Sequence, residues 1–372
     1  MKPKTKFPVQ YAAIIKRMHS IKPQKYAGTR NFINGNVSYL SPYISRGVIS
    51  TKQVMEFVQQ QDLKPYLVSK FIQELAWRDY YQLVYKELGD ALLKDIKHKQ
   101  PGVVHKQLPE AIYKADTGIE AIDELIQNFY ETGYMHNHMR MYTSSITCNI
   151  GKVYWLQPSR WLYYHLMDGD IASNTCSWQW VAGTFSSKKY YCNQANINRY
   201  TASKQEETFL DKPYGVLVKM DIPKVLNKTV KLTLKTKLPK TELPKIDTTK
   251  PTLLYSSYNL DPVWRKDEKV NRVLLLEPSH FKKFPVNEKV IEFVIGLSKN
   301  IKGIQLYCGE VKDIEAIYKA DKQKANFISK EHPAFTHYTG IKDERDWMFP
   351  ELTGYYKSFS QFYKKAYKLL KK

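Results

Sequence analysis

Apolar residues recur every three or four positions along much of the first half of the chain, which is the period of a helix with one buried face. This pattern predicts helices over residues 11–18, over residues 51–88 as two consecutive helices, and over residues 111–128. Gly133 then ends the helical run before a further helix through residues 135–141. The first half of the chain is therefore predicted to be all-helical.

The pattern changes after Pro251. Two short apolar runs, each followed by a segment of helical period, predict the order strand, helix, strand, helix at residues 272–277, 286–298, 301–308 and 310–319. Strands that alternate with helices are typical of a parallel sheet. The first strand is not followed by a glycine-rich loop, which argues against a nucleotide site there. A last helix over residues 355–370 is expected to pack on this sheet.

Together these patterns predict a mainly α protein with four segments. Residues 1–25 form a basic lead-in, residues 26–218 a helical domain, residues 219–250 a lysine- and proline-rich linker, and residues 251–372 a small α/β domain. The linker shows little apolar periodicity, which favours a connecting segment. Its lysines leave a second interpretation open, an arm that contacts phosphate groups.

The balance of charged residues indicates which class of partner the chain binds. The chain of 372 residues carries 58 Lys and Arg against 36 Asp and Glu, a formal net charge of +22. Such a balance favours a polyanionic partner, with nucleic acid as the first candidate. An anionic membrane is the alternative, but the longest apolar runs, such as residues 273–276, are far shorter than the ~20 residues of a membrane-spanning helix. Residues 1–8 lack the apolar core of a signal peptide, so a cytoplasmic or nucleoid-associated protein is expected. We also expect it to be a monomer.

The cysteines give no sign of a metal site. Cys148, Cys176, Cys192 and Cys308 form no Cys-x-x-Cys pair and have no histidine at a metal-ligand spacing. We expect reduced, mostly buried thiols and no bound metal.

Residues 135–180 hold the densest set of chemically active side chains. A helix through residues 135–141 would place Asn137, Arg140 and Met141 on one face, because residues three and four apart lie on the same side. Residues 166–180 then bring two carboxylates, an amide and two indoles close together. Taken singly, these residues have ordinary explanations: a core tryptophan, a turn at Asp-Gly-Asp and a solvated arginine.

The two indoles of this stretch, Trp178 and Trp180, are two positions apart. On a helix that spacing turns them roughly 200° from each other, at about 100° per residue. One indole can then face the interior while the other lines an outer pocket. An amphipathic helix with two core aromatics would space them by three or four instead.

Taken together, residues 135–180 resemble the flavin-binding helical domain of the photolyase/cryptochrome family, on the branch that repairs cyclobutane pyrimidine dimers. The likeness runs from about residue 26 to residue 201. It implies FAD as the cofactor and damaged DNA, single- or double-stranded, as the partner. In that family a large α/β antenna domain precedes the helical domain, and we expect that domain to be absent from the front of this chain.

The resemblance assigns a set of residues to the flavin. Arg140 matches an arginine that lies over the isoalloxazine ring and pairs with an aspartate, here Asp168. Asp170 matches a second flavin-contacting carboxylate, and Asn174 matches the amide that faces flavin N5. Arg140 is a planar, permanently charged donor that suits the electron-rich edge of a reduced flavin, and Asp168 would hold it in place. The diphosphate and ribose are assigned to Tyr26, Val37, Ser38, Leu40 and Ser41, although Ser38 taken alone is a plain helix cap.

An electron-transfer chain and a lesion pocket also follow from the resemblance. Trp178 and Trp155 match the proximal and middle tryptophans, and no tryptophan lies between Trp77 and Trp155 to serve as the distal one. Lesion contacts are assigned to Asn137, Met141, Trp180 and the Glu-x-x-Trp-Arg motif of Glu74, Trp77 and Arg78. That motif taken alone is a salt-bridged helix face with a half-buried tryptophan. Lys188 and Lys189 stand in a short basic loop that could contact DNA phosphate.

These assignments lead to one main function and two alternatives. The main one is a light-dependent lyase that splits pyrimidine dimers by electron donation from photoexcited reduced FAD, with Asn174, Asn137 and Glu74 among its active-site residues. The second is a cryptochrome-like FAD photosensor without repair activity. The third is a basic nucleic-acid-binding protein that has lost flavin, which the intact Arg140 and Asp168 disfavour.

Overall fold

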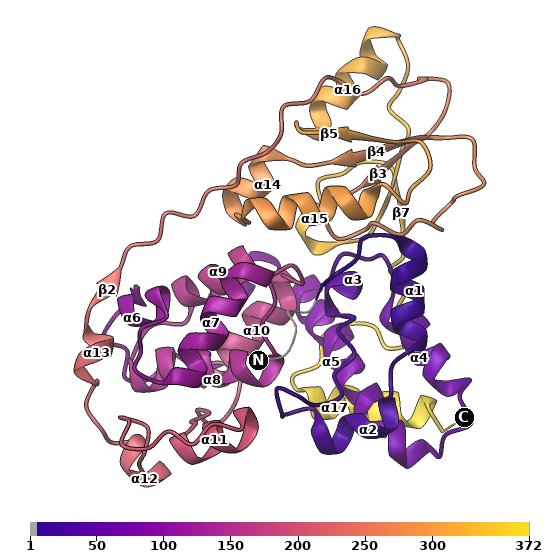
Figure 1. The fold of residues 1–372 in the computed structure, drawn as a ribbon. Helices are drawn as coiled ribbons and strands as arrows, with labels where there is room; N and C mark the ends of the chain where they lie inside the picture. Colours follow the sequence, from indigo (N-terminus) through magenta and orange to yellow (C-terminus); the bar gives the residue numbers. More distant parts are fainter. Residues whose placement is uncertain (1–5, 372) are drawn as a thin grey trace.

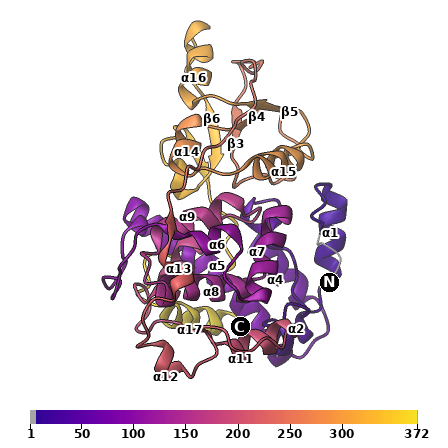
Figure 2. The same ribbon diagram turned by 60° about the vertical axis from the view of Figure 1, so that its left-hand side comes forward.

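The computed structural model describes residues 6–371. Figures 1 and 2 show a helical body and, beside it, a smaller body built around a sheet. The sequence of mostly helices followed by a parallel sheet agrees with the predicted fold class. The four domain boundaries stay predictions, and residues 1–5 of the basic lead-in lie outside the described residues.

The helical body contains most of the helices. They are α1 (Tyr11–His19), α2 (Pro23–Thr29), α3 (Ser41–Ser45), α4 (Thr51–Gln59), α5 (Pro65–Leu88), α6 (Glu110–Lys114), α7 (Glu120–Thr132), α8 (Asn137–Ser145), α9 (Leu156–His165), α10 (Ile171–Ala182), α11 (Gln194–Thr201), α12 (Tyr214–Leu217) and α13 (Lys224–Asn227). A 3-10 turn, η1 (Gly89–Leu93), follows α5, and a π turn, η2 (Ile146–Ile150), extends α8. One short antiparallel pair, β1 (Leu108–Pro109) with β2 (Thr229–Val230), interrupts the predicted all-helical pattern.

Local sequence explains where the central helices begin and end. Helix α4 starts at a capping box in which Ser50 and Gln53 satisfy each other's backbone N–H groups. Helix α10 starts at Asp170, whose carboxylate accepts from the Ser173 N–H at 2.6 Å. Gly133 ends α7 in the left-handed conformation, as predicted.

The helix predicted over residues 111–128 is wrong as a single element, because the chain forms α6 and α7 with a turn between them. Ala115 and Gly118 adopt positive φ angles of 56° and 77°, which break the helix. The Asp123 carboxylate accepts from the backbone N–H groups of Thr117 and Gly118 and so stabilises the turn. Apolar periodicity continues through the break, which is why the pattern did not reveal it.

The second body contains a five-stranded parallel sheet in the order β5-β4-β3-β6-β7. Its elements are β3 (Thr252–Tyr255), β4 (Asn271–Leu275), α14 (Pro278–Lys283), α15 (Glu288–Ser298), β5 (Ile304–Tyr307), α16 (Val311–Ala320), β6 (Phe327–Lys330), the 3-10 turn η3 (Pro333–Phe335) and β7 (Ile341–Asp343). The predicted strand–helix–strand–helix unit is confirmed as β4, α15, β5 and α16. Strands β3, β6 and β7 were not predicted.

The last helix, α17 (Phe359–Leu369), lies against α5 of the helical body, so the prediction that it packs on the sheet is wrong. The Phe359 ring stacks on the Trp77 ring at 3.6 Å between centroids and 10° between planes. Phe362 is fully buried beside Tyr80, and the Tyr80 hydroxyl donates to the Tyr356 carbonyl at 3.2 Å. The aromatic face of α17 packs on an aromatic face of α5, and these ring contacts place α17 on the helical body and not on the sheet.

A buried arginine joins the two bodies. Arg46, which follows α3, donates to the carbonyls of Met167 and Ser257, at 3.0 and 3.5 Å. Ser257 follows strand β3, so this guanidinium connects the helical core to one end of the sheet. Across residues 6–371, no helix is long and apolar enough to span a bilayer.

Candidate cofactor site

Two arginines and two buried aspartates form a charged cluster inside the helical body. The Arg140 Nη2 donates to both oxygens of Asp168, at 3.0 and 2.9 Å, and its Nε donates to the Met135 carbonyl at 2.8 Å. The side chain of Asp168 is only 2 % exposed. The predicted Arg140–Asp168 pair is therefore present, held by one guanidinium nitrogen.

Arg78 belongs to this cluster, although the sequence assigned it to the substrate side. Its Nη1 donates to the Ser45 hydroxyl at 3.1 Å, and its charge interacts with both Asp168 and Asp170. Burial lowers the pKa of the Arg78 guanidinium, while these two carboxylates oppose the shift. The arginine of the Glu-x-x-Trp-Arg motif therefore points toward the charged cluster and not toward an outer pocket.

The Asp168 carboxylate stays ionised because of these neighbours. Burial raises the pKa of Asp168, but Arg140, Arg78 and a hydrogen bond from Ser41 outweigh it, so the pKa lies below its usual value. Asp170 accepts from the Gln82 amide at 2.6 Å while it caps α10. The cluster is therefore a preformed set of fixed charges.

The segment predicted to hold a diphosphate lies next to this cluster. Ser41 contacts Asp168, and the half-buried Tyr26 lies beside Arg78. Ser38 does not cap α3, because Leu40 occupies the N-cap position and the Ser38 hydroxyl accepts from the Leu40 N–H at 3.3 Å. Val37 is half-buried and Leu40 fully buried. Helix α3 has five residues, so its N-terminus is a weaker anion site than the sequence predicted.

Asn174 lies one turn along α10 from Asp170, at a small cavity between α9 and the end of α14. Its amide donates to the Ser159 carbonyl at 2.9 Å. Tyr163, Lys283 and Phe284 also line this cavity. Its backbone N–H donates to the Asp170 carbonyl at 2.9 Å, so Asn174 adjoins the arginine–aspartate cluster through α10. Within residues 6–371, no hydrogen bond joins its side chain to Arg140.

The two tryptophans of α10 differ in exposure, as their spacing predicted. Trp178 is fully buried, whereas Trp180 is half-buried and has the Tyr190 ring 5.7 Å away. Trp155 lies in the same apolar core as Trp178, and its indole N–H donates to Asp95 at 2.7 Å. The Trp178 indole nitrogen is buried without a partner among the described residues.

The residues assigned to a lesion pocket lie in different environments. Asn137 is exposed, and Met141 shares its half-exposed face of α8 with Arg140, as predicted. Glu74 forms an ion pair with Lys70 at 2.8 Å, which agrees with the simpler salt-bridge interpretation. Trp77 has one ring face covered by Phe359, so a base cannot stack on that face. These two contacts restrict the pocket that the sequence suggested.

The two lysines of the basic loop also differ. Lys188 is exposed, whereas the Lys189 ammonium donates to the Pro101 carbonyl at 2.8 Å. Burial lowers the pKa of Lys189. Lys188 is therefore the freer of the two for a phosphate contact.

Two residues beside the cluster, Gln82 and Arg46, were missed by sequence reasoning. Gln82 could have been found, because Glu74, Arg78 and Gln82 follow one another at intervals of four along α5 and share a face. Arg46 gave no comparable signal, since its partners are carbonyl groups far along the chain.

Comparison with known proteins identifies the domain in which this cluster lies. Residues 71–242 match the family model described as the FAD binding domain of DNA photolyase. This segment is a photolyase-type FAD-binding domain. FAD is accordingly its cofactor, as predicted, and Arg78, Arg140, Asp168 and Asp170 all fall inside the matched residues.

Two curated relatives are both named deoxyribodipyrimidine photo-lyase. The chain is 30 % identical over 176 residues to a deoxyribodipyrimidine photo-lyase of Alkalihalophilus pseudofirmus, a match that covers 45 % of this chain and 36 % of the relative. It is 29 % identical over 227 residues to the mitochondrial deoxyribodipyrimidine photo-lyase of Saccharomyces cerevisiae, which covers 55 % of this chain and 38 % of the relative. The matches thus span little more than a third of these relatives.

Among solved structures, a Synechocystis cryptochrome aligns with a TM-score of 0.48 at 22 % identity. That alignment covers 53 % of this chain and 44 % of the cryptochrome.

The donor set of the FAD-binding domain fits a flavin. Arg140 and Arg78 are planar cations that lie beside carboxylates, which suits the polar edge of an isoalloxazine ring. The buried Gln82 Oε1 and Trp178 Nε1 have no partner among the described residues. Buried polar atoms without partners are rare, and a bound cofactor would supply partners for such atoms.

Proposed function

We propose that the protein is a light-dependent DNA repair flavoprotein, a lyase that splits cyclobutane pyrimidine dimers. The observation that carries the proposal is the cluster of two arginines, Arg140 and Arg78, around the buried Asp168 and Asp170 within the FAD-binding domain. The photo-lyase names of the relatives support the reaction class. Bound FAD would absorb the light and supply the electron that opens the dimer.

The residues of this chain would do the remaining work. Arg140, fixed by Asp168, would hold the flavin ring, and Asp170 with Gln82 would fix the first turn of α10 beside it. Asn137 and Met141 lie on the face of α8 that also carries Arg140, where they would contact an extruded dimer. Trp180, half-buried on α10, would provide an aromatic surface for stacking.

A second candidate function is a flavin photosensor without repair activity. The Phe359–Trp77 stack favours it, because a photosensor does not need Trp77 free for a damaged base. The repair function requires the dimer to bind through Trp180, Asn137 and Met141, or to displace α17 from Trp77.

Binding measurements on two variants separate pocket contacts from charge. We expect Lys188→Ala to weaken binding to intact and dimer-containing duplexes by the same factor, since a phosphate contact carries no information on damage. We expect Trp180→Ala to lower the preference for the dimer by about fivefold or more, because base–aromatic stacking contributes about 1–3 kcal/mol. Fluorescence anisotropy with both duplexes at one salt concentration measures both ratios. An unchanged preference in Trp180→Ala would remove this residue from the pocket.

A further inference from the structure

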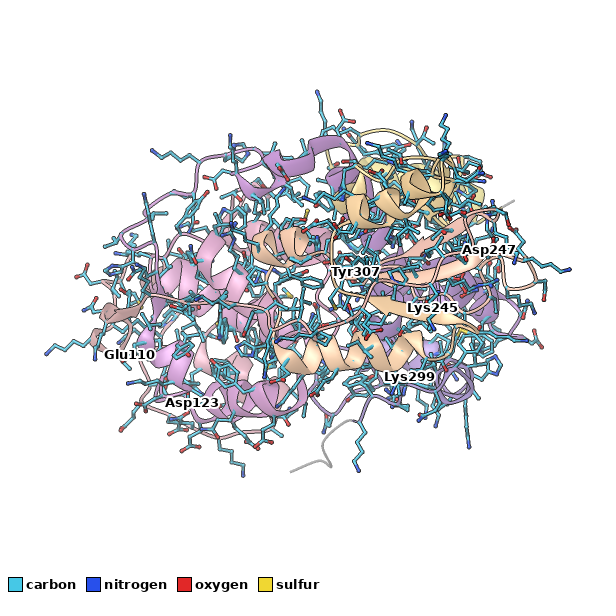
Figure 3. All side chains as sticks on the ribbon, turned by 90° about the horizontal axis from the view of Figure 1, so that it is seen from above. Glu110, Asp123, Lys245, Asp247, Lys299 and Tyr307 are labelled. Atoms are coloured by element: carbon cyan, nitrogen blue, oxygen red, sulfur yellow. The ribbon has the colours of Figure 1, made fainter. Side chains whose placement is uncertain are left out.

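A lysine-rich segment, residues 229–246, crosses from the helical body to the sheet body as one extended chain, which we call the strap (Figure 1). It begins where Val230 of β2 pairs with Leu108. It ends where the Lys245 N–H donates to Gln305 Oε1 at 2.7 Å. Figure 3 labels Glu110, beside the start of the strap, and Lys245 and Asp247 at its far end.

Side chains alternate in exposure along the middle of the strap. Leu232 packs on the core of the helical body and Leu238 on the core that includes the sheet. The half-buried positions are Leu232, Leu234, Thr236 and Leu238, and the exposed ones are Lys231, Thr233, Lys235 and Lys237. This period of two is that of an extended chain with one face buried. Lys231, Lys235 and Lys237 are therefore directed to the outer face, and Lys240, which follows the half-buried Pro239, is also exposed.

The backbone of the strap is fixed in place. The Tyr164 hydroxyl donates to the Lys235 carbonyl at 3.0 Å. The Thr236 hydroxyl donates to the Val286 carbonyl at 2.8 Å and accepts from the Val286 N–H at 2.7 Å. Further along, the Thr241 hydroxyl accepts from the Cys308 N–H at 2.8 Å. A row of charges on a fixed backbone loses less entropy on binding than the same charges on a flexible linker.

Most of this positive charge is not neutralised within the chain. Residues 222–241 contain no Asp or Glu, and their lysines are Lys224, Lys228, Lys231, Lys235, Lys237 and Lys240. Lys228 pairs with Glu110 at 2.7 Å, and Lys237 approaches Glu288 at 3.8 Å with both side chains well exposed. Across residues 6–371, Lys231, Lys235 and Lys240 have no carboxylate within ion-pair distance.

We propose that the strap binds the phosphate backbone of duplex DNA, a second contact surface that deepens the proposed function. The nine-residue step from Lys231 to Lys240 spans about 30 Å at roughly 3.3 Å per residue. That length matches about nine base pairs at 3.4 Å each, so a straight row of lysines can follow a stiff duplex. A membrane surface fits less well, because no large apolar side chain is exposed between residues 231 and 240.

Two variants with the same change of net charge test this proposal. The first replaces Lys231, Lys235, Lys237 and Lys240 by Gln. The control replaces Lys302, Lys312, Lys319 and Lys324, which are exposed lysines of the sheet body, by Gln. Binding to an undamaged duplex is measured in the dark over a range of salt concentrations, and thermal unfolding confirms that both variants are folded.

We expect the strap variant to bind the duplex at least about tenfold more weakly at low salt, with the slope of log K against log salt reduced by about 3 to 4. The control variant should stay within about threefold of the wild type, since only general charge is lost. Equal losses in the two variants, or a strap variant that matches the wild type, would overturn the proposal. So would stronger competition by poly-glutamate than by duplex DNA, which would point to an acidic protein partner.

The outcome is independent of the repair reaction. If the protein repairs no dimers, the wild type still binds intact duplex through the strap, and the strap variant still binds it more weakly. If the strap proposal fails, the preference for damaged over intact DNA is unaffected, because that ratio depends on the pocket and not on the strap.

Discussion

An Asp168→Asn variant is expected to purify with little or no FAD and to be less stable by about 3–5 kcal/mol, which is the usual cost of leaving a buried charge without its partner. The side chain of Asp168 is 2 % exposed and faces both Arg140 and Arg78. The substitution preserves shape but leaves Arg140 without its ion-pair partner and Arg78 with Asp170 as its remaining carboxylate. Arg140 would then lose the contact that orients it toward the flavin.

The ratio of flavin to protein absorbance measures retention, and denaturant unfolding measures stability. Asp247→Asn is the matched control, because Asp247 pairs with Lys250 at the surface and such pairs contribute little. Full flavin content in Asp168→Asn, with stability equal to that of the control, would show that the arginine–aspartate cluster does not hold the cofactor.

A Phe359→Ala variant is expected to lose about 3–5 kcal/mol of stability, the usual range for removing a buried phenylalanine ring. Phe359 is 8 % exposed and contacts Trp77, Tyr80 and Phe362. Removing its ring leaves a cavity between α17 and α5 and uncovers one face of the Trp77 indole. Tryptophan emission should then shift to longer wavelength.

Tyr367→Ala on the same helix is the control, since Tyr367 is 45 % exposed and should contribute little. Urea unfolding of both variants gives the two losses. If Phe359→Ala costs no more than Tyr367→Ala and leaves the emission unchanged, α17 does not pack on Trp77 in solution. Phe359 would then no longer prevent a damaged base from stacking on Trp77.

Local patterns predicted those parts of the protein that depend on neighbouring residues. Gly133 ended α7 as expected, and the spacing of Trp178 and Trp180 correctly placed one indole inside and the other at the surface. The Arg140–Asp168 contact was also anticipated, because it followed from a family resemblance in a stretch with dense motifs.

Contacts between distant segments could not be predicted in this way. The position of α17 depends on an aromatic surface of α5 more than two hundred residues earlier, as in the bond from Tyr80 to Tyr356. Arg78 was assigned to the substrate side because a motif fixes its residue type and not the direction of its side chain. Strands β3, β6 and β7 are recognisable only once they are seen paired in the sheet.

The most direct test of the proposed function is the loss of thymine dimers from oligonucleotides under blue light. The purified, FAD-loaded protein is reduced and mixed with single-stranded or duplex DNA that contains one dimer, and the dimer is quantified before and after illumination. We expect dimers to disappear only in the light, and only with protein that retains FAD, so that Asp168→Asn is inactive. Dimers that remain intact in both kinds of DNA, with the wild type fully loaded with reduced FAD, would contradict the repair function and favour the photosensor.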